Sequence, residues 1–260
     1  MRSISKWGYA ASAILLLSFG TIPLKKITVY LIGDSTMADK AFSEYPETGW
    51  GMSFHYFFGP DATTDNRAKN GRSTRTFIEE GRWKAVAEKL HPGDYVLIQF
   101  GHNDEVPTKR SYTPPEQFTA NLEKFVEETQ AKKAYPILIT PVTRRSFDSS
   151  GHLIDTHAHY AALVRQVARE EKVPLIDLDA KSMALLKTFG PRRSRYLYDY
   201  VAAGENPHFP EGHEDNTHFS ELGARKIAEI VAHDIRRVAP GLARYFRDED
   251  RPEGRKKVSH

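Results

Sequence analysis

Three polar segments of the sequence have the residue types needed for acyl transfer. They contain Ser35 after Gly33-Asp34, Gly71, and Asn103. The first and third follow short apolar runs, and the second follows a weaker strand candidate. A serine at a strand-to-helix turn can present its hydroxyl to a substrate and point its own N–H into the same site. A glycine allows close approach of the backbone and adds a second N–H, and an asparagine amide adds a third donor. Ser35, Gly71 and Asn103 are therefore predicted to form an oxyanion hole.

A fourth segment, near the end of the chain, supplies a base. In Asp215-Asn216-Thr217-His218 the carboxylate and the imidazole stand three residues apart, just before a predicted last helix. On a tight loop the carboxylate can hold one ring nitrogen while the other faces the serine. The sequence thus predicts Ser35 as nucleophile, His218 as base and Asp215 as the residue that orients the base.

Each of these segments also has an ordinary structural interpretation when taken alone. Ser35 could cap a helix or bind an anion, and Gly71 could simply serve a turn. Asn103 could cap the turn that follows it, while Asp215 and His218 could form an Asx turn with a surface histidine. Their joint occurrence, in order and next to predicted strands or a helix, favours the catalytic interpretation.

The elements that must position these residues follow from alternating apolar runs and amphipathic segments. Strands buried on both faces are predicted at residues 27–32, 95–100, 136–140 and 173–178, with a weaker candidate at 63–67. Helices are predicted at residues 50–58, 83–90, 115–132, 156–171, 180–189 and 223–238. This alternation indicates one α/β domain with a doubly wound parallel sheet. In the order 2-1-3-4-5 the first three strands would be neighbours, and the three oxyanion residues would meet.

The composition excludes several classes of function. The chain has 260 residues, of which 40% are hydrophobic and 27% charged, as in an ordinary globular protein. After residue 20 the charged side chains nearly balance, so no basic field indicates a nucleic-acid partner. There is no cysteine, which excludes disulfides, a thiol nucleophile and thiolate zinc sites.

The two ends of the chain carry their own signals. Residues 1–20 resemble a signal peptide, with Arg2 and Lys6 before an apolar stretch and small residues before Thr21. The alternative is an uncleaved membrane anchor, although the apolar run is shorter than the ~20 residues that span a bilayer. We expect a secreted or periplasmic protein with no membrane partner beyond this leader. Residues 247–260 are mostly charged or polar, which predicts a disordered polar tail.

The polar segments resemble the sequence blocks of the SGNH (GDSL-like) hydrolases, and within that class the chain is similar to the rhamnogalacturonan acetylesterases. The shared signatures are Gly33-Asp34-Ser35-Thr36-Met37, Gly49-Trp50-Gly51, Asn70-Gly71-Arg72-Ser73, Phe100-Gly101-His102-Asn103-Asp104 and Asp215-Asn216-Thr217-His218-Phe219. The resemblance implies an SGNH hydrolase domain over residues 27–240. It also implies a flavodoxin-like three-layer α/β/α sandwich and deacetylation of pectic polysaccharide without a metal or other cofactor.

An anionic pectic substrate calls for positive and aromatic side chains near the serine. Arginine recognises carboxylates in bidentate fashion, and Arg72 and Arg75 are predicted to contact the substrate. Arg144 and Arg145 follow the fourth predicted strand at the same edge of the sheet. Trp50 is predicted as a wall of the site on which a sugar ring stacks. The alternative for any of these arginines is a solvated surface charge.

Other functions stay open at this stage. His157 with His159, or His208 with His213 and His218, could mark a metal-dependent hydrolase, but a metal ligand at His218 could not also act as the base. Within the SGNH class the substrate could instead be acetylxylan, a lipid or a thioester. A third hypothesis is a non-catalytic carbohydrate-binding protein, although such a protein would not require a serine with a histidine base. We expect a monomer that acts on an acetylated polysaccharide or oligosaccharide.

Overall fold

The structure is a computed structural model, and it describes residues 24–247. The predicted leader at residues 1–20 lies outside the described residues, and so does the predicted polar tail apart from Arg247. Between residues 24 and 247, no helix combines the length and the apolar character that crossing a membrane requires.

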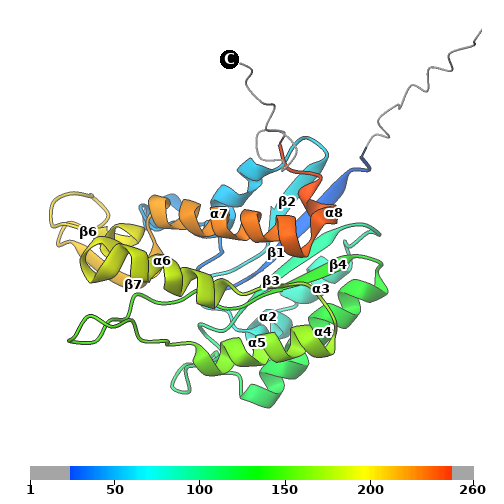
Figure 1. Cartoon of the computed structure of the whole chain (residues 1–260), viewed down its shortest axis with the longest axis horizontal. Helices are drawn as coiled ribbons and strands as arrows, with labels where there is room; N and C mark the ends of the chain where they lie inside the picture. Colours follow the sequence, from blue (N-terminus) through cyan, green and yellow to red (C-terminus); the bar gives the residue numbers. More distant parts are fainter. Residues whose placement is uncertain (1–23, 248–260) are drawn as a thin grey trace, which may run out of the picture.

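A parallel sheet forms the centre of the described chain (Figure 1). Its strands are β1 (Ile27–Gly33), β2 (Ala62–Asn66), β3 (Tyr95–Gln99), β4 (Tyr135–Ile139) and β5 (Leu175–Ile176). They lie in the order β2-β1-β3-β4-β5, which confirms the predicted order 2-1-3-4-5. Every neighbouring pair is parallel, so the carboxyl ends of β1, β2 and β3 share one edge of the sheet.

Helices cover both faces of this sheet, as Figure 1 shows, which confirms the predicted three-layer α/β/α sandwich. One face carries α1 (Trp50–Phe54), α6 (Leu178–Arg193), α7 (Glu221–Val238) and α8 (Pro240–Ala243). The other face carries α2 (Thr74–Glu79), α3 (Arg82–Ala87), α4 (Pro115–Ala131) and α5 (Ala158–Glu170). Short 3-10 helices are η1 (Phe42–Glu44), η2 (His55–Phe57) and η3 (Ser194–Leu197).

The burial of the strands explains why their sequences are so apolar. Along β1, Val29 and Leu31 enter the core beneath α1 and α7, while Tyr30 and Ile32 enter the core beneath α2 to α5. A strand covered on both faces must be apolar at every position, not at alternate ones. The edge strand β2 is only partly buried and contains threonine, aspartate and asparagine, which is why its sequence signal is weak.

Two features of the fold differ from the sequence-based expectation. A small antiparallel sheet of β6 (Tyr198–Val201) and β7 (His213–Phe219) was not predicted, and neither was helix α2. The segment from Asp215 to His218 therefore lies on a strand, not on the predicted tight loop. The sequence of β7 is almost entirely polar, so no apolar alternation marks it as a strand, and only its pairing with β6 makes it one.

Helix α1 packs directly on the turn that follows β1. The N–H of Trp50 donates to the carbonyl of Thr36 at 3.0 Å. A Cβ atom added at Gly49 would lie 2.0 Å from the carbonyl oxygen of Ala38, and one at Gly51 would lie 2.5 Å from the carbonyl oxygen of Met37. Since both obstacles are backbone atoms, the Gly-Trp-Gly sequence is required for the two segments to approach this closely.

We predict that Gly49→Ala destabilises the protein and displaces the turn that contains Ser35. The added methyl group must push backbone against backbone, and overpacking of this kind costs about 1–3 kcal/mol. We expect thermal unfolding to show a melting temperature lower by about 3–10 °C. Gly59→Ala is the control, because its Cβ would meet only the carbonyl oxygen of Tyr245 at an ordinary 3.5 Å. Equal melting temperatures for the two variants would contradict the close-approach argument.

Candidate active site

The turn after β1 is built around a buried carboxylate. Oδ1 of Asp34 accepts hydrogen bonds from the N–H of Thr36 at 3.0 Å and from its hydroxyl at 2.8 Å. The amide of Gln99 on β3 donates to the same hydroxyl at 2.7 Å. Complete burial raises the pKa of Asp34, against the lowering effect of the bonds from Thr36. These bonds fix the backbone on both sides of Ser35, a residue that is buried to 8% exposure.

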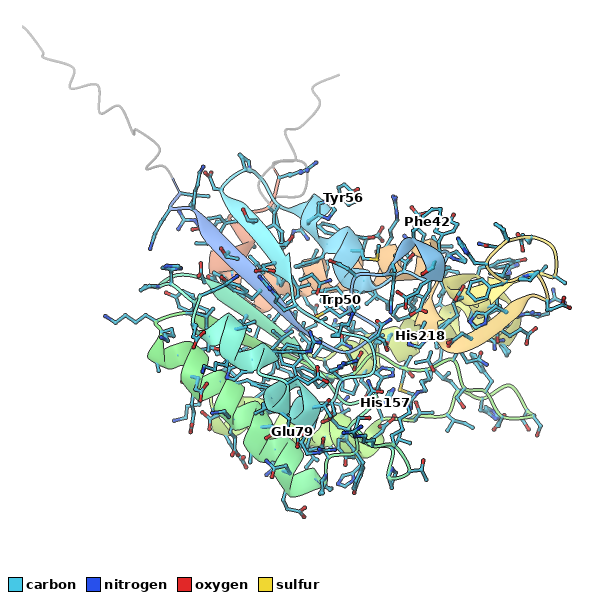
Figure 2. All side chains as sticks on the ribbon, turned by 180° about the vertical axis from the view of Figure 1, so that it is seen from behind. Phe42, Trp50, Tyr56, Glu79, His157 and His218 are labelled. Atoms are coloured by element: carbon cyan, nitrogen blue, oxygen red, sulfur yellow. The ribbon has the colours of Figure 1, made fainter. Side chains whose placement is uncertain are left out.

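The predicted nucleophile, base and orienting carboxylate form one continuous chain of hydrogen bonds. Nε2 of His218 lies 2.8 Å from Oγ of Ser35, and Nδ1 of His218 lies 2.7 Å from Oδ2 of Asp215. The other oxygen of Asp215 accepts the N–H of His218 at 3.0 Å. Figure 2 shows His218 beyond the carboxyl ends of the sheet strands. The structure thus brings together the three residues that the sequence singled out.

The electrostatics of this chain select one protonation pattern. Burial by itself would raise the pKa of Asp215, but the hydrogen bonds and charge of His218 and the N–H of Thr217 hold that pKa well below its usual range. An ionised Asp215 requires Nδ1 of His218 to carry a proton and donate it. Nε2 then has its lone pair free to accept the hydroxyl proton of Ser35, as a general base requires.

The other two predicted oxyanion donors, Gly71 and Asn103, lie in the loops after the two strands that neighbour β1. The N–H of Lys69 donates to the carbonyl of Gly33 at 3.0 Å, which keeps the chain after β2 beside the chain after β1. Gly71 follows with a φ of 76°, a left-handed conformation that favours glycine. The side-chain amide of Asn103 donates to the carbonyl of Arg72 at 3.2 Å. Asn103 therefore lies against the residue next to Gly71, as the strand order predicted.

A second buried carboxylate holds these two loops together. Oδ1 of Asp104 accepts the N–H of Thr74 at 2.8 Å and its hydroxyl at 2.6 Å. The amide of Asn121 on α4 also donates to that hydroxyl at 3.0 Å. Burial raises the pKa of Asp104 to about 7. Asp104 thus joins the loop after β3, which contains Asn103, to the start of α2.

The predicted substrate contacts are placed differently from the catalytic set. Trp50 is 0% exposed and its indole N–H donates to Oε1 of Gln99 at 2.6 Å, so the expectation that it forms a wall of the site is wrong. Its large ring fills the core beneath α1, which spacing along the chain could not reveal. Arg72 donates to Glu80 at 3.0 and 3.1 Å, and Arg75 donates to Glu79 at 2.8 Å. Both arginines have intramolecular partners, and their contact with substrate stays a prediction.

Two arginines follow β4, at the edge of the sheet where the sequence places them. Arg144 donates to the carbonyl of His102 at 3.1 Å and forms an ion pair with Glu105, so it supports the loop that contains Asn103. Arg145 donates to the side-chain oxygen of Asn216 at 2.7 Å, and its N–H donates to the carbonyl of Asn216 at 2.8 Å. Arg144 therefore stabilises the loop after β3, and Arg145 stabilises the strand that contains Asp215 and His218.

The histidines that could have formed a metal site have other contacts. His157 lies 2.9 Å from Glu105, His213 lies 3.4 Å from Asp199, and His208 packs edge-on against Phe42. Within residues 24–247, no group of three or more histidine, aspartate or glutamate side chains is arranged to hold a metal ion.

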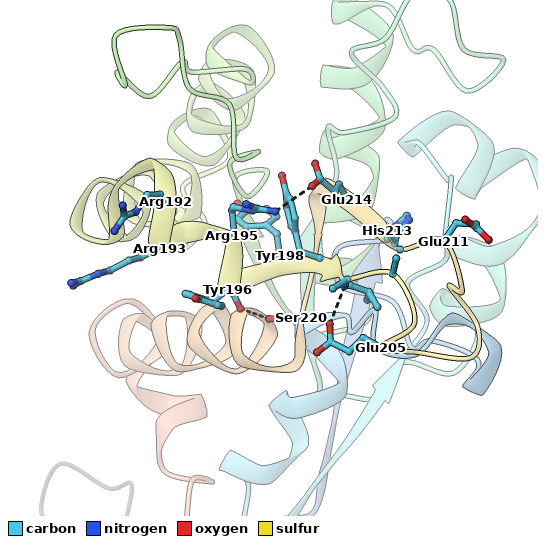
Figure 3. A pocket seen from close by; sticks show the side chains of 15 residues that line it. Arg192, Arg193, Arg195, Tyr196, Tyr198, Glu205, Glu211, His213, Glu214 and Ser220 are labelled. Carbon is cyan, nitrogen blue, oxygen red and sulfur yellow. Dashed lines mark hydrogen bonds and ion pairs between the residues drawn. The ribbon is translucent and has the colours of Figure 1, made fainter.

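A hollow of about 940 Å³ lies beside the β6–β7 hairpin (Figure 3). Arg192, Arg193, Tyr196, Tyr200 and His213 are among the residues that line it. Its lining includes His213 and Glu214 of β7, the strand that also contributes Asp215 and His218, but it contains neither Ser35 nor His218. The hollow is therefore next to the reacting groups and not the place where they meet.

Comparison with known proteins agrees with this geometry. Residues 31–226 match the sequence profile of the GDSL-like lipase/acylhydrolase family. The chain belongs to this family. It is 43% identical to the rhamnogalacturonan acetylesterase RhgT of Bacillus subtilis, over 81% of this chain and 90% of the relative. It is 35% identical to the probable rhamnogalacturonan acetylesterase YesY of the same organism, over 80% of this chain and 92% of the relative.

Two solved structures have a similar fold. The crystal structure of protein YxiM from Bacillus subtilis is 29% identical with a TM-score of 0.70, over 85% of this chain and 58% of that one. The acetylxylan esterase Axe2 from Geobacillus stearothermophilus is 19% identical with a TM-score of 0.57, over 81% of this chain and 94% of that one. At such low identity the second likeness concerns the fold alone.

We predict that Asp104→Asn makes the stability of the protein less sensitive to pH. The pKa of about 7 exceeds the ordinary value of 3.8, so between these pH values the folded protein keeps a proton that the unfolded chain releases. The free energy of unfolding then falls as the pH rises through this range. Asparagine keeps an oxygen to accept from Thr74 but cannot ionise. Urea unfolding between pH 4 and 8 should show a shallower slope for the variant, and identical slopes would contradict the assignment.

Proposed function

We propose that this chain is a serine esterase that removes O-acetyl groups from pectic polysaccharide of the rhamnogalacturonan type. The hydrogen-bond chain from Ser35 through His218 to Asp215, with distances of 2.8 and 2.7 Å, carries the proposal. It is the arrangement that activates a serine hydroxyl for attack on an ester carbonyl.

In the proposed reaction each of the five site residues has one role. His218 takes the proton of Ser35 as the hydroxyl oxygen attacks the acetyl carbonyl, and Asp215 stabilises the imidazolium. The N–H groups of Ser35 and Gly71 and the amide of Asn103 hold the oxyanion, each contributing roughly 10²–10³-fold in rate. The imidazolium then protonates the departing sugar oxygen, which leaves an acetyl group on Ser35. Water, deprotonated by His218, attacks this ester and releases acetate.

The choice of substrate rests on the relatives and on charge. RhgT and YesY are named as a rhamnogalacturonan acetylesterase and a probable one, and each aligns with about four fifths of this chain. A galacturonate-containing chain is anionic, and Arg192 and Arg193 line the hollow beside β7 with exposed side chains. Within the described residues neither arginine makes an ion pair, so both are available to a carboxylate. The leader-like residues 1–20 support a secreted or periplasmic location, where such a substrate is met.

We predict that Ser35→Ala abolishes acetate release, with a loss of at least about 10⁴-fold in kcat, because no other hydroxyl faces Nε2 of His218 among the described residues. The melting temperature should change by less than about 2 °C, since only one small hydroxyl group is removed. Ser150→Ala is the control, since Ser150 is an exposed loop residue. Substantial turnover by Ser35→Ala would refute the serine mechanism.

We further predict a preference among acetylated substrates. Acetate release should be faster from acetylated rhamnogalacturonan than from acetylated xylan at equal acetyl concentration, and a chelator should leave both rates unchanged. Faster release from acetylated xylan would contradict the substrate assignment but not the serine mechanism. Loss of activity with the chelator would point to a metal-dependent reaction instead.

A further inference from the structure

A second carboxylate, not assigned from the sequence, faces the reactive nitrogen of His218. Oε1 of Glu47 lies 3.9 Å from Nε2 of His218, the same nitrogen that lies 2.8 Å from Oγ of Ser35. Glu47 stands in the segment between η1 and α1, and its side chain is 16% exposed. Asp215 acts on the opposite side of the ring, at Nδ1. The imidazole is thus held between two carboxylates.

Glu47 is itself paired with a buried lysine. Nζ of Lys40 lies 2.6 Å from Oε1 of Glu47, and the Lys40 side chain is only 2% exposed. Lys40 also donates to the side-chain oxygen of Asn70 at 2.8 Å. Asn70 directly precedes Gly71, so Lys40 connects the carboxylate beside His218 with the loop that supplies a predicted oxyanion donor. A lysine is buried only where its charge has such partners.

The segment that contains Glu47 is fastened to the strand that contains His218. The N–H of Thr48 donates to the carbonyl of Phe219 at 2.8 Å. Phe219 is the residue directly after His218. The side chain of Asn206, in the loop between β6 and β7, donates to the carbonyl of Tyr45 at 3.2 Å. Hydrogen bonds to the backbone before and after Glu47 therefore hold its segment against the β6–β7 sheet and loop.

We infer that Glu47 is a positioning residue that stabilises the imidazolium of His218, and that Lys40 limits the strength of this effect. When the proton of Ser35 moves to Nε2, the new positive charge lies about 4 Å from the Glu47 carboxylate, where opposite charges attract. This inference rests on the proposed serine mechanism, and it assigns the charge balance of that same site.

Several other titratable groups surround the ring and enter the same balance. They are Asp215 and His213 on β7, Asp199 on β6, Asp34 after β1 and His102 after β3. Burial lowers the pKa of His102 well below its usual range, so this neighbour is uncharged. Burial, together with the nearby carboxylates, raises the pKa of Asp199 to about 6. Among the carboxylates of the described residues, only Glu47 has an oxygen within 4 Å of Nε2 of His218.

The test is the pH profile of kcat/KM for a small aryl acetate, measured on the full chain with two variants of opposite effect. Glu47→Gln removes a negative charge next to the imidazolium, so the acidic limb should shift by about 0.5 unit to lower pH and kcat should fall about 5–10-fold. Lys40→Met removes the opposing positive charge, so the limb should shift to higher pH. KM should stay within about twofold, because an aryl acetate does not depend on sugar contacts.

Two further variants separate this electrostatic role from a structural one. Asp39→Asn removes a carboxylate eight positions before Glu47, but Asp39 is exposed and accepts a hydrogen bond from Asn66 at 2.7 Å. The acidic limb of this variant should therefore coincide with that of the wild type. Glu47→Asp keeps the negative charge, so its acidic limb should lie close to that of the wild type. If Lys40→Met does not fold, these variants and Glu47→Gln suffice.

The inference is overturned if Glu47→Gln has the acidic limb of the wild type, or if Asp39→Asn shifts the limb as much. This failure is distinct from that of the proposed function. If Ser35→Ala is inactive but Glu47→Gln has the wild-type pH profile, the serine mechanism stands and only the role of Glu47 is refuted. A Ser35→Ala variant that stays active removes both.

Discussion

A hydrogen bond of 2.8 Å between residues 183 positions apart is the contact on which the site depends. Ser35 comes from the end of β1 in the main sheet, whereas His218 comes from β7 in the small antiparallel sheet. A proton can pass between them only if the two sheets are fixed relative to each other to within a few tenths of an ångström. Much of the packing near the site serves this requirement.

Close backbone contacts provide that rigidity. Gly49 and Gly51 let α1 pack on the turn after β1. Gly223 does the same for α7, because a Cβ there would lie 1.8 Å from the carbonyl oxygen of Leu197 in η3. Since β6 and β7 adjoin η3 and α7, the small sheet is held against the main domain by backbone packing. Side chains can change rotamer, but backbone atoms in direct contact cannot separate without moving whole elements.

The buried carboxylates around the site divide into two kinds. Burial raises the pKa values of Asp34, Asp104 and Asp199, and the first two accept hydrogen bonds that shape the turns after β1 and β3. Asp215 is also partly buried, but the imidazole and two backbone N–H groups lower its pKa well below the usual range. The pKa of the carboxylate next to the base is therefore lowered, while burial raises the pKa values of the other three.

The chemistry of the site could be predicted from the sequence because it depends on residue types at strand ends. Ser35 and Asn103 follow apolar runs and Gly71 follows a weaker strand candidate, and parallel strands bring their carboxyl ends to one edge. The strands themselves were marked by their apolar sequences, whereas their order came with the flavodoxin-like fold that the family resemblance implies, and the structure confirms that order.

Only the tertiary structure decided which other residues surround this chemistry. Trp50 lies in the core, and β7 is a strand despite its polar sequence. Glu47, which pairs with Lys40, faces His218 across a gap of 171 positions in the chain. None of these placements has a local sequence signal. They result from the packing of α1 on the serine turn and of β7 on β6, and packing between distant segments depends on the whole fold, not on the residues next to each position.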